Sequence, residues 1–185
     1  MEKIKDAMKK ILQLSSEIVS ELDSEKVKGF IEQLKKAKRV YTAGIGSLGL
    51  IIKGFVTKLM YLGYETYFIG ETLMPSPSKD DLFIAVSESG ETDYTVKATH
   101  IAKNLGATIV AITSNSQSTL GKLADLNIEI KWKEQLSKTK EELKEDRGGI
   151  LTLDSSLFEI TTLVFLNTII SELANKDREK GKDQK

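Results

Sequence analysis

The sequence predicts an α/β fold in which a parallel sheet is covered by helices on both faces. Three observations predict it. Short β-rich runs recur along the chain, longer helical segments separate most of them, and glycine- or serine-rich turns follow several runs. Strands joined through helices form parallel sheets with right-handed crossovers. We therefore expect three layers, αβα, with five parallel strands preceded by two N-terminal helices.

The elements follow in order. Apolar residues at helical spacing predict a first helix between Ile4 and Leu22, and Ser24 can cap a second helix that carries Val27 to Leu34. The predicted strands are 40–43, 67–69, 82–86, 108–112 and 126–130. The helix that follows Thr92 should bury a stripe made of Tyr94, Ala98, Ile101, Ala102 and Leu105. The last helix should start at Ser155–Glu159 and bury Phe158, Thr162, Phe165, Leu166 and Ile169.

Length and composition predict a single domain. We place it at residues 1–175, with the two helices in 1–36, the αβα core in 37–175, and a charged, frayed tail at 176–185. The densely charged segment 131–147 predicts a solvated excursion or a short helix. Cysteine is absent, which excludes disulfides and thiolate chemistry and favours a reducing, cytoplasmic location.

Charge and hydropathy limit the kinds of partner that the chain can bind. Lysine plus arginine equals aspartate plus glutamate at 27 each, so no bulk positive field attracts nucleic acid or an anionic membrane. We find no signal peptide and no run of about 20 apolar residues. The only histidine, His100, falls on the polar side of its helix, so we expect an exposed or interface residue and no histidine-rich metal site.

The segment 87–92, Ser-Glu-Ser-Gly-Glu-Thr, predicts an anion site. It follows an apolar strand and opens a helix, so backbone N–H groups and hydroxyls gather where the helix dipole is positive. A phosphate suits this loop, held by Ser87, Ser89, Gly90 and Thr92. The alternative is an ordinary polar turn that caps a helix. Glu88 and Glu91 should point away from an anion.

The loop Gly44-x-Gly46-x-x-Gly49 also follows a strand and opens a helix. It matches the dinucleotide fingerprint, and Glu71 could bind a ribose. Alternatively, these glycines only permit a tight turn and close packing of helix on sheet. Segment 113–116 could line the pocket formed by the serine-rich loop at 87–92, or it could cap the helix at Leu120. Glu159 could be a general base or a first-turn capping carboxylate, and the residues leave these two open.

With these motifs, the chain resembles the sugar isomerase (SIS) domain family from about Lys36 to Ala174, and within it the 6-phospho-3-hexuloisomerases. The resemblance rests on Ser-x-Ser-Gly-x-Thr at 87–92, on Gly70-Glu71-Thr72 followed by Pro75 and by Asp80-Asp81-Leu82, and on Ser-Ser-Leu-Phe-Glu at 155–159. It implies a flavodoxin-like, SIS-type sheet.

The resemblance implies a cofactor-free isomerase that interconverts 3-hexulose 6-phosphate and fructose 6-phosphate through a cis-enediol. Glu159 would be the catalytic base, and Ser47 would join the phosphate ligands named above. The substrate pocket would contain Gly46, Glu71, Thr72, Thr113, Ser114 and Ser156. The resemblance also implies a dimer or tetramer, with the segment Ile4 to Leu22 against a partner, and no metal.

Two departures from the family pattern keep other functions open. Ser47 stands where these isomerases usually have arginine, and the C-terminal segment contains no histidine. A sugar-phosphate-binding sensor is therefore the first alternative to catalysis. A nucleotide-binding domain that uses the loop at 44–49 is the second.

Overall fold

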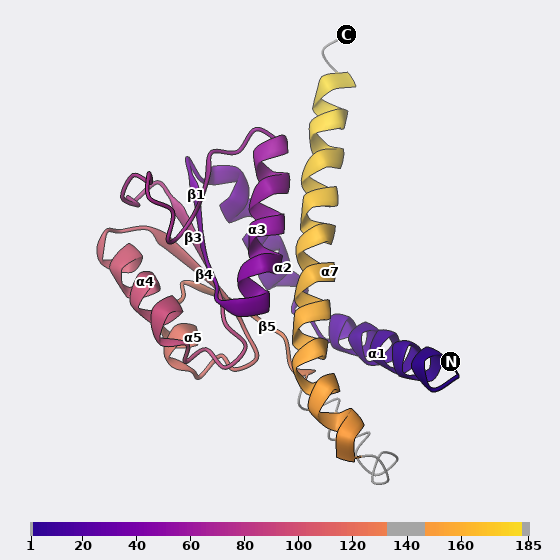
Figure 1. Cartoon of the computed structure of the whole chain (residues 1–185). Helices are drawn as coiled ribbons and strands as arrows, with labels where there is room; N and C mark the ends of the chain where they lie inside the picture. Colours follow the sequence, from indigo (N-terminus) through magenta and orange to yellow (C-terminus); the bar gives the residue numbers. More distant parts are fainter. Residues whose placement is uncertain (1, 133–146, 183–185) are drawn as a thin grey trace.

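The structure, a computed structural model, describes residues 2–132 and 147–182 (Figure 1). It contains a five-stranded sheet in which every neighbouring pair is parallel. The strands lie in the order β2 (Thr66–Phe68), β1 (Val40–Ala43), β3 (Leu82–Val86), β4 (Thr108–Thr113) and β5 (Leu126–Glu129). The five strands predicted from the sequence are confirmed, with bounds that differ by one residue in β2, β4 and β5.

Helices cover both faces of this sheet, as predicted. One face carries α2 (Ser24–Lys36), α3 (Gly46–Tyr61) and the long α7 (Arg147–Lys182), and α1 (Glu2–Ser20) packs against α7. The other face carries α4 (Asp93–Asn104) and the short α5 (Thr119–Leu123). Figure 1 shows α4 and α5 on the side of the sheet opposite α7, and α1 projecting away from the sheet.

The larger hydrophobic core lies between the sheet and the helices α1, α2, α3 and α7. At its centre the Phe30 ring lies 6.5 Å from Phe55 and 5.9 Å from Phe165, measured between centroids. The predicted stripe of α7 is confirmed: Phe158, Thr162, Phe165, Leu166 and Ile169 are buried. By length and composition, Ser156–Asn175 could cross a membrane. Its buried stripe accounts for that apolar character, because core helices are equally apolar.

Two predicted helix starts are wrong. Asp23, not Ser24, caps α2, since its carboxylate accepts hydrogen bonds from the N–H groups of Glu25 and Lys26. Helix α7 begins at Arg147 rather than at Ser155, and it continues to Lys182, where we expected a frayed tail. Within the segment 131–147, residues 133–146 lie outside the described part of the chain.

The predicted buried stripe of α4 is also wrong in part. Tyr94, Ile101 and Leu105 are exposed, and the residues that face the sheet are Thr95, Thr99 and Ala102. Small side chains let the helix approach the sheet closely, and the Thr99 hydroxyl donates to the Thr95 carbonyl, which satisfies it within the helix. The larger side chains are therefore turned aside. His100 is exposed, as predicted.

Strands β1 and β3 are adjacent, although β2 lies between them in the sequence. Their connections therefore leave in opposite directions, α3 to one face and α4 to the other. Such a reversal of strand order leaves a crevice beyond the carboxyl ends of the two strands, where ligands bind in open α/β sheets.

At the amino-terminal ends of the strands, an ion pair joins the residues directly before β1 and β3. Arg39 donates to both carboxylate oxygens of Asp81, at 3.0 and 2.6 Å, and the Asp81 side chain is fully buried. Burial by itself raises the pKa of Asp81, but hydrogen bonds from Arg39 and Ser78 outweigh it and hold the pKa below its usual value. This pair stabilises the fold at the end remote from the crevice.

Candidate functional site

The candidate site lies at the crevice between the carboxyl ends of β1 and β3. In the sheet register, Ala43 is paired with Ala85. The glycine loop begins one residue after Ala43, and the serine loop begins two residues after Ala85. Neighbouring strands lie about 4.8 Å apart, so the two loops start side by side.

The serine loop is folded around the hydroxyl of Ser87, which is buried. This oxygen accepts a hydrogen bond from the Gly90 N–H at 3.1 Å and shares another with the Thr92 hydroxyl at 2.8 Å. Ser89 is exposed, and its oxygen accepts the Glu91 N–H at 3.2 Å, which leaves its hydroxyl hydrogen to donate outward. Ser87 and Thr92 therefore shape the loop, and Ser89 presents a donor.

Gly90 requires its glycine for two reasons. Its φ of +69° lies in the left-handed region. A Cβ at this position would also lie 2.0 Å from the Ser118 Oγ and 2.5 Å from the Ser118 Cβ. The Gly90 carbonyl accepts the Leu120 N–H at 3.0 Å, so the loop rests directly on the start of α5.

Residues from the next loop hold the serine loop from behind. The hydroxyls of Thr113 and Ser114 both donate to the Glu88 carbonyl, at 3.0 and 2.8 Å. The Glu91 carboxylate accepts the Thr119 N–H at 2.8 Å, and this hydrogen bond lowers the pKa of Glu91. Glu91 thus faces α5, as we expected of a carboxylate beside an anion loop. Thr113 and Ser114 are engaged in supporting the loop.

Ser47 and Glu159 form the second part of the site. The Ser47 hydroxyl, in the first turn of α3, donates to the Glu159 carboxylate on α7. Lys58 and Asn167 form another hydrogen bond between the same two helices. Both contacts advance along the two helices in the same direction, so α3 and α7 run parallel and bring Glu159 to the start of α3.

The position of Glu159 within α7 decides whether this residue can be a first-turn capping carboxylate. It lies 12 residues after Arg147, which is about 18 Å along the helix axis. The helix dipole and the unpaired N–H groups act only within the first turn. Glu159 is therefore not a capping residue, and the capping interpretation is wrong. It is half-buried, at the crevice, and bonded to one hydroxyl.

The two helices that begin at the crevice lack side-chain caps. Neither Ile45 at the start of α3 nor Thr92 at the start of α4 accepts a hydrogen bond from its helix through its side chain. In contrast, Asp23 caps α2 and Ser118 caps α5. First-turn N–H groups without a protein partner are donors available to a ligand, and the dipole favours an anion there.

The glycine loop allows α3 to begin close to β1. A Cβ on Gly49 would lie 2.9 Å from the Gly44 carbonyl oxygen, so only glycine permits this approach of helix to strand. Gly46 starts α3 at the crevice. Close packing of helix on strand is thus observed at Gly49, and a ligand role of this loop stays a prediction. A pyrophosphate at this helix start would face the Glu159 carboxylate, which disfavours it electrostatically.

The remaining predicted pocket residues are Ser156, Glu71 and Thr72. Ser156 is half-buried on α7, one turn before Glu159. Glu71 and Thr72 are exposed in the connection that leaves β2. Within residues 2–132 and 147–182, no group of three or more histidine, aspartate or glutamate side chains is placed to hold a metal ion.

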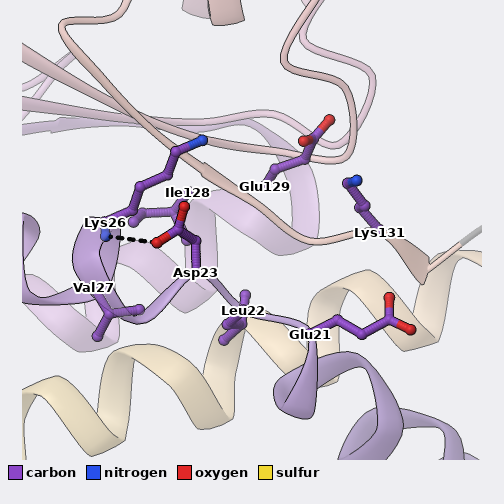
Figure 2. Close-up of a pocket in the computed structure, with 8 residues that line it drawn as sticks. All are labelled: Glu21, Leu22, Asp23, Lys26, Val27, Ile128, Glu129 and Lys131. Carbon is purple, nitrogen blue, oxygen red and sulfur yellow. Dashed lines mark hydrogen bonds between the residues drawn. The ribbon is translucent and has the colours of Figure 1, made fainter.

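A separate cavity of about 250 Å³ lies between the turn joining α1 to α2 and the end of β5 (Figure 2). Figure 2 shows its acidic side chains, Glu21, Asp23 and Glu129, beside Lys26 and Lys131. Asp23 caps α2, and Glu129 accepts the Ser116 N–H. Its charges thus offset one another or serve the fold, and none of the crevice residues lines it.

Sequence reasoning missed Ser118. A cap of α5 within 113–116 was one of two open alternatives, and it is wrong. The Ser118 hydroxyl accepts the Gly121 N–H at 3.1 Å, and the Ser118 side chain fills the space opposite Gly90. A serine directly before a short apolar run is a cap signal, which would have indicated the capping role. The contact with Gly90 joins two loops and leaves no local pattern.

Comparisons with known proteins give a consistent result. The SIS domain profile matches residues 33–139. A 3-hexulose-6-phosphate isomerase of Methanocaldococcus jannaschii is 33% identical, over 82% of this chain and 76% of its own. A crystal structure of a Methanococcus jannaschii protein, inferred to be a 3-hexulose-6-phosphate isomerase, superposes with a TM-score of 0.73 at 30% identity, covering 96% of this chain and 92% of that one.

A solved structure with a different biological role has the same fold. The sugar isomerase domain of an RpiR transcription factor from Sphaerobacter thermophilus superposes with a TM-score of 0.73. It is 19% identical and covers 97% of this chain and 93% of that one. At this identity the similarity shows the fold alone.

Proposed function

Because the chain belongs to the SIS domain family, we propose that it isomerises a phosphorylated sugar, with 3-hexulose 6-phosphate and fructose 6-phosphate as the substrate pair. Relatives named as 3-hexulose-6-phosphate isomerases support this choice. The observation that carries the proposal is the placement of a half-buried carboxylate, Glu159, beside an uncapped helix start and next to a serine loop suited to phosphate.

The serine loop binds the phosphate in this proposal. Ser89 donates its hydroxyl, and the first N–H groups of α4 point toward the same anion. Ser87, Gly90 and Thr92 keep the loop in the required shape. A sugar held by its phosphate places its carbon chain across the crevice, toward β1 and α3, where Glu159 lies.

Glu159 moves the proton. The carboxylate removes the hydrogen on C2 of the 3-ketose as a proton, the C2–H electron pair forms the C2=C3 bond, and the C3 carbonyl electron pair moves onto its oxygen to give an enediolate. The C2 hydroxyl proton passes to that oxygen, and Glu159 returns its proton to C3 as the C2 carbonyl forms. No electrons leave the sugar, so the reaction needs no redox cofactor. Ser47 positions the carboxylate through its hydrogen bond. The first N–H groups of α3 are donors for the enediolate oxygen.

In this proposal Ser47 positions Glu159 and does not bind the phosphate, unlike the role that the family resemblance implied. Its hydroxyl already donates to Glu159, and a phosphate beside that carboxylate would be repelled. Thr113 and Ser114 likewise support the loop rather than the sugar. Gly46 starts α3 at the crevice and Ser156 lies one turn before Glu159, so both stay proposed pocket residues. Glu71 and Thr72, in the connection that leaves β2, stay proposed as well.

Deuterium exchange tests the reaction. In deuterated water, fructose 6-phosphate should acquire deuterium at C3 with the native protein, as measured by NMR or mass spectrometry. Glu159→Gln should abolish this exchange, while Glu32→Gln, the same change on the exposed surface of α2, should not alter it. Failure of the native protein to exchange any hexose or pentose phosphate would contradict catalysis.

Phosphate affinity is tested separately. Ser89→Ala removes a donor to a charged group and should weaken fructose 6-phosphate binding by about 1.5–3 kcal/mol, measured by calorimetry. Ser47→Ala, also an exposed serine, is the matched control and should bind normally. Equal losses in both variants would place the phosphate between the two loops rather than at the serine loop.

A sugar-phosphate sensor is the second candidate. Serine in place of the family arginine at position 47 favours it, because the charge that arginine would offer to the enediolate is missing there. The same fold serves as a domain of a transcription factor in the Sphaerobacter thermophilus protein. Tight binding of fructose 6-phosphate without deuterium exchange would support this candidate over the isomerase.

We propose that α1 associates with a second copy of the chain. Ile4, Met8, Leu12 and Val19 are each more than 40% exposed, and α1 projects from the sheet (Figure 1). An exposed apolar row of this length on a projecting helix is typical of an interface. A dimer or tetramer is the expected assembly.

A further inference from the structure

The Tyr94 side chain reaches from the first turn of α4 to the connection that leaves β2. A Cβ at Gly70 would lie 3.0 Å from the Tyr94 hydroxyl, so this hydroxyl is close to the Gly70 backbone. Gly70 has a φ of +108°, which favours glycine, and the absence of a side chain there leaves room for the hydroxyl. Tyr94 therefore joins the helix that follows the serine loop to the connection that carries Glu71 and Thr72.

The sheet register places this hydroxyl at the level of the crevice. Thr42 of β1 is paired with Phe68 of β2. Because paired parallel strands advance together, Gly70 lies two residues beyond this pair, at the level of Gly44, where the glycine loop begins. The Tyr94 hydroxyl is thus next to the carboxyl end of β1, which is one side of the crevice.

Tyr94 and Glu159 lie on opposite faces of the sheet. Glu159 belongs to α7 and accepts the Ser47 hydroxyl of α3, whereas α4 covers the other face (Figure 1). A sugar chain that crosses the crevice from the serine loop therefore has the carboxylate on one side and the tyrosine on the other. Proton removal by Glu159 requires the reacting carbon to stay close to that carboxylate, and a contact on the opposite side keeps it there.

The hydroxyl of Tyr94 is available to a ligand. Within the described part of the chain it has no hydrogen-bond partner, and the residue is 42% exposed. The ring lines a groove of about 540 Å³ beside α4, together with Ile69 and Met74. Tyrosine has an apolar body and a polar tip, so apolar neighbours hold the ring while the hydroxyl meets solvent or a ligand.

The charged groups beside Tyr94 leave the phosphate to the serine loop. Asp93 and Lys97, which also line the groove, form an ion pair at 2.7 Å. Their charges offset each other, so this pair does not draw a phosphate away from the loop. An uncharged hydroxyl both donates and accepts hydrogen bonds, which suits the hydroxyl groups of a sugar.

We propose that the Tyr94 hydroxyl forms a hydrogen bond with a hydroxyl group of the sugar and thereby helps to select the substrate. This inference rests on the proposed function, and it adds a contact to the sugar that neither the serine loop nor Glu159 supplies. The phosphate fixes one end of the substrate, and the tyrosine holds the carbon chain toward the carboxylate. A sugar phosphate without the contacted hydroxyl binds less tightly, because this hydrogen bond is lost.

Calorimetric titration of Tyr94→Phe tests the proposal. The variant keeps the ring and loses only the hydroxyl, so fructose 6-phosphate should bind about 2- to 12-fold more weakly, the value of one neutral hydrogen bond. Inorganic phosphate should bind as it does to the native protein, because the serine loop is intact. Tyr61→Phe is the matched control: Tyr61 is 77% exposed at the end of α3, remote from the crevice, and this change should alter neither affinity.

Monodeoxy analogues of fructose 6-phosphate, each lacking one hydroxyl, identify the contacted group. One analogue should bind the native protein and Tyr94→Phe equally, because the ligand and the variant each remove the same hydrogen bond. The other analogues should keep the preference for the native protein. The same preference for every analogue would overturn the proposal.

Two further results of the titration would also overturn it: equal affinity of native protein and Tyr94→Phe for fructose 6-phosphate, or a matching loss of affinity for inorganic phosphate. These measurements report binding and not turnover, so they stand apart from the deuterium-exchange test of the isomerase. A native protein that binds no sugar phosphate would overturn the proposed function, and this inference with it.

Discussion

Replacement of Gly90 by alanine tests how the serine loop is built. The variant adds one methyl group at the point where the loop touches α5. Its Cβ would lie 2.0 Å from the Ser118 Oγ and 2.5 Å from the Ser118 Cβ, at a φ of +69°. Rotation of Ser118 could move the Oγ but not the Cβ, so the contact persists unless the backbone moves.

Two energetic costs set the expected loss in the free energy of unfolding. The left-handed backbone costs a non-glycine residue about 1–2 kcal/mol, and overpacking adds about 1–3 kcal/mol. The free energy of unfolding should therefore fall by about 2–5 kcal/mol, which for a chain of this length lowers the melting temperature by about 4–20 °C. If the loop moves to relieve the contact, the loss is smaller and phosphate binding is lost instead.

The assay pairs thermal unfolding with phosphate titration at one protein concentration. Gly54→Ala is the matched control: it lies in the exposed middle of α3, and a Cβ there meets nothing within 4 Å. It should stabilise the protein by about 0.5–1 kcal/mol, because alanine favours helix. A Gly90→Ala protein with native stability and native affinity for fructose 6-phosphate would refute the described geometry of the loop.

Two further predictions concern the pairs Ser47–Glu159 and Arg39–Asp81. Ser47→Ala should lower kcat by about 10- to 150-fold, the value of one hydrogen bond to a charged group, with little change in KM. A raised KM with normal kcat would instead make Ser47 a substrate ligand. Asp81→Asn should cost about 3 kcal/mol at pH 7, because it leaves Arg39 without its buried partner. Folding lowers the pKa of Asp81 below its ordinary value of 3.8. The ion pair therefore stabilises the folded protein fully above pH 3.8, and this stabilisation is lost as the pH falls through the folded-state pKa. In urea titrations, the difference between variant and native protein should thus shrink at pH 3, and a constant difference would contradict the role of this ion pair.

The sheet was predictable because its signals are local. Each β-rich run and the turn after it depend on adjacent residues, so all five strands and the two loops at the crevice could be placed from the sequence. Helix starts were less predictable: Asp23, Ser24 and Ser118 are all competent caps, and the packing of each helix selects among them.

The stripe of α4 was mispredicted for a different reason. Periodicity identifies an apolar face but not what covers it. Thr95 and Thr99 bond within the helix or pack on the sheet, while Ile101 faces outward. A pattern within a single helix cannot distinguish the face that packs on the sheet from a side of the helix that lines a groove beside it.

The sequence by itself determined the parallel αβα fold, the family, and the serine and glycine loops, because these depend on residues close together in the chain. Only the tertiary structure joined Ser47 to Glu159 and fitted Gly90 against Ser118. Residues 47 and 159 are 112 positions apart, and a hydrogen bond between them depends on how α3 and α7 pack on the sheet. That packing is set by the whole core, and so no local pattern specifies it.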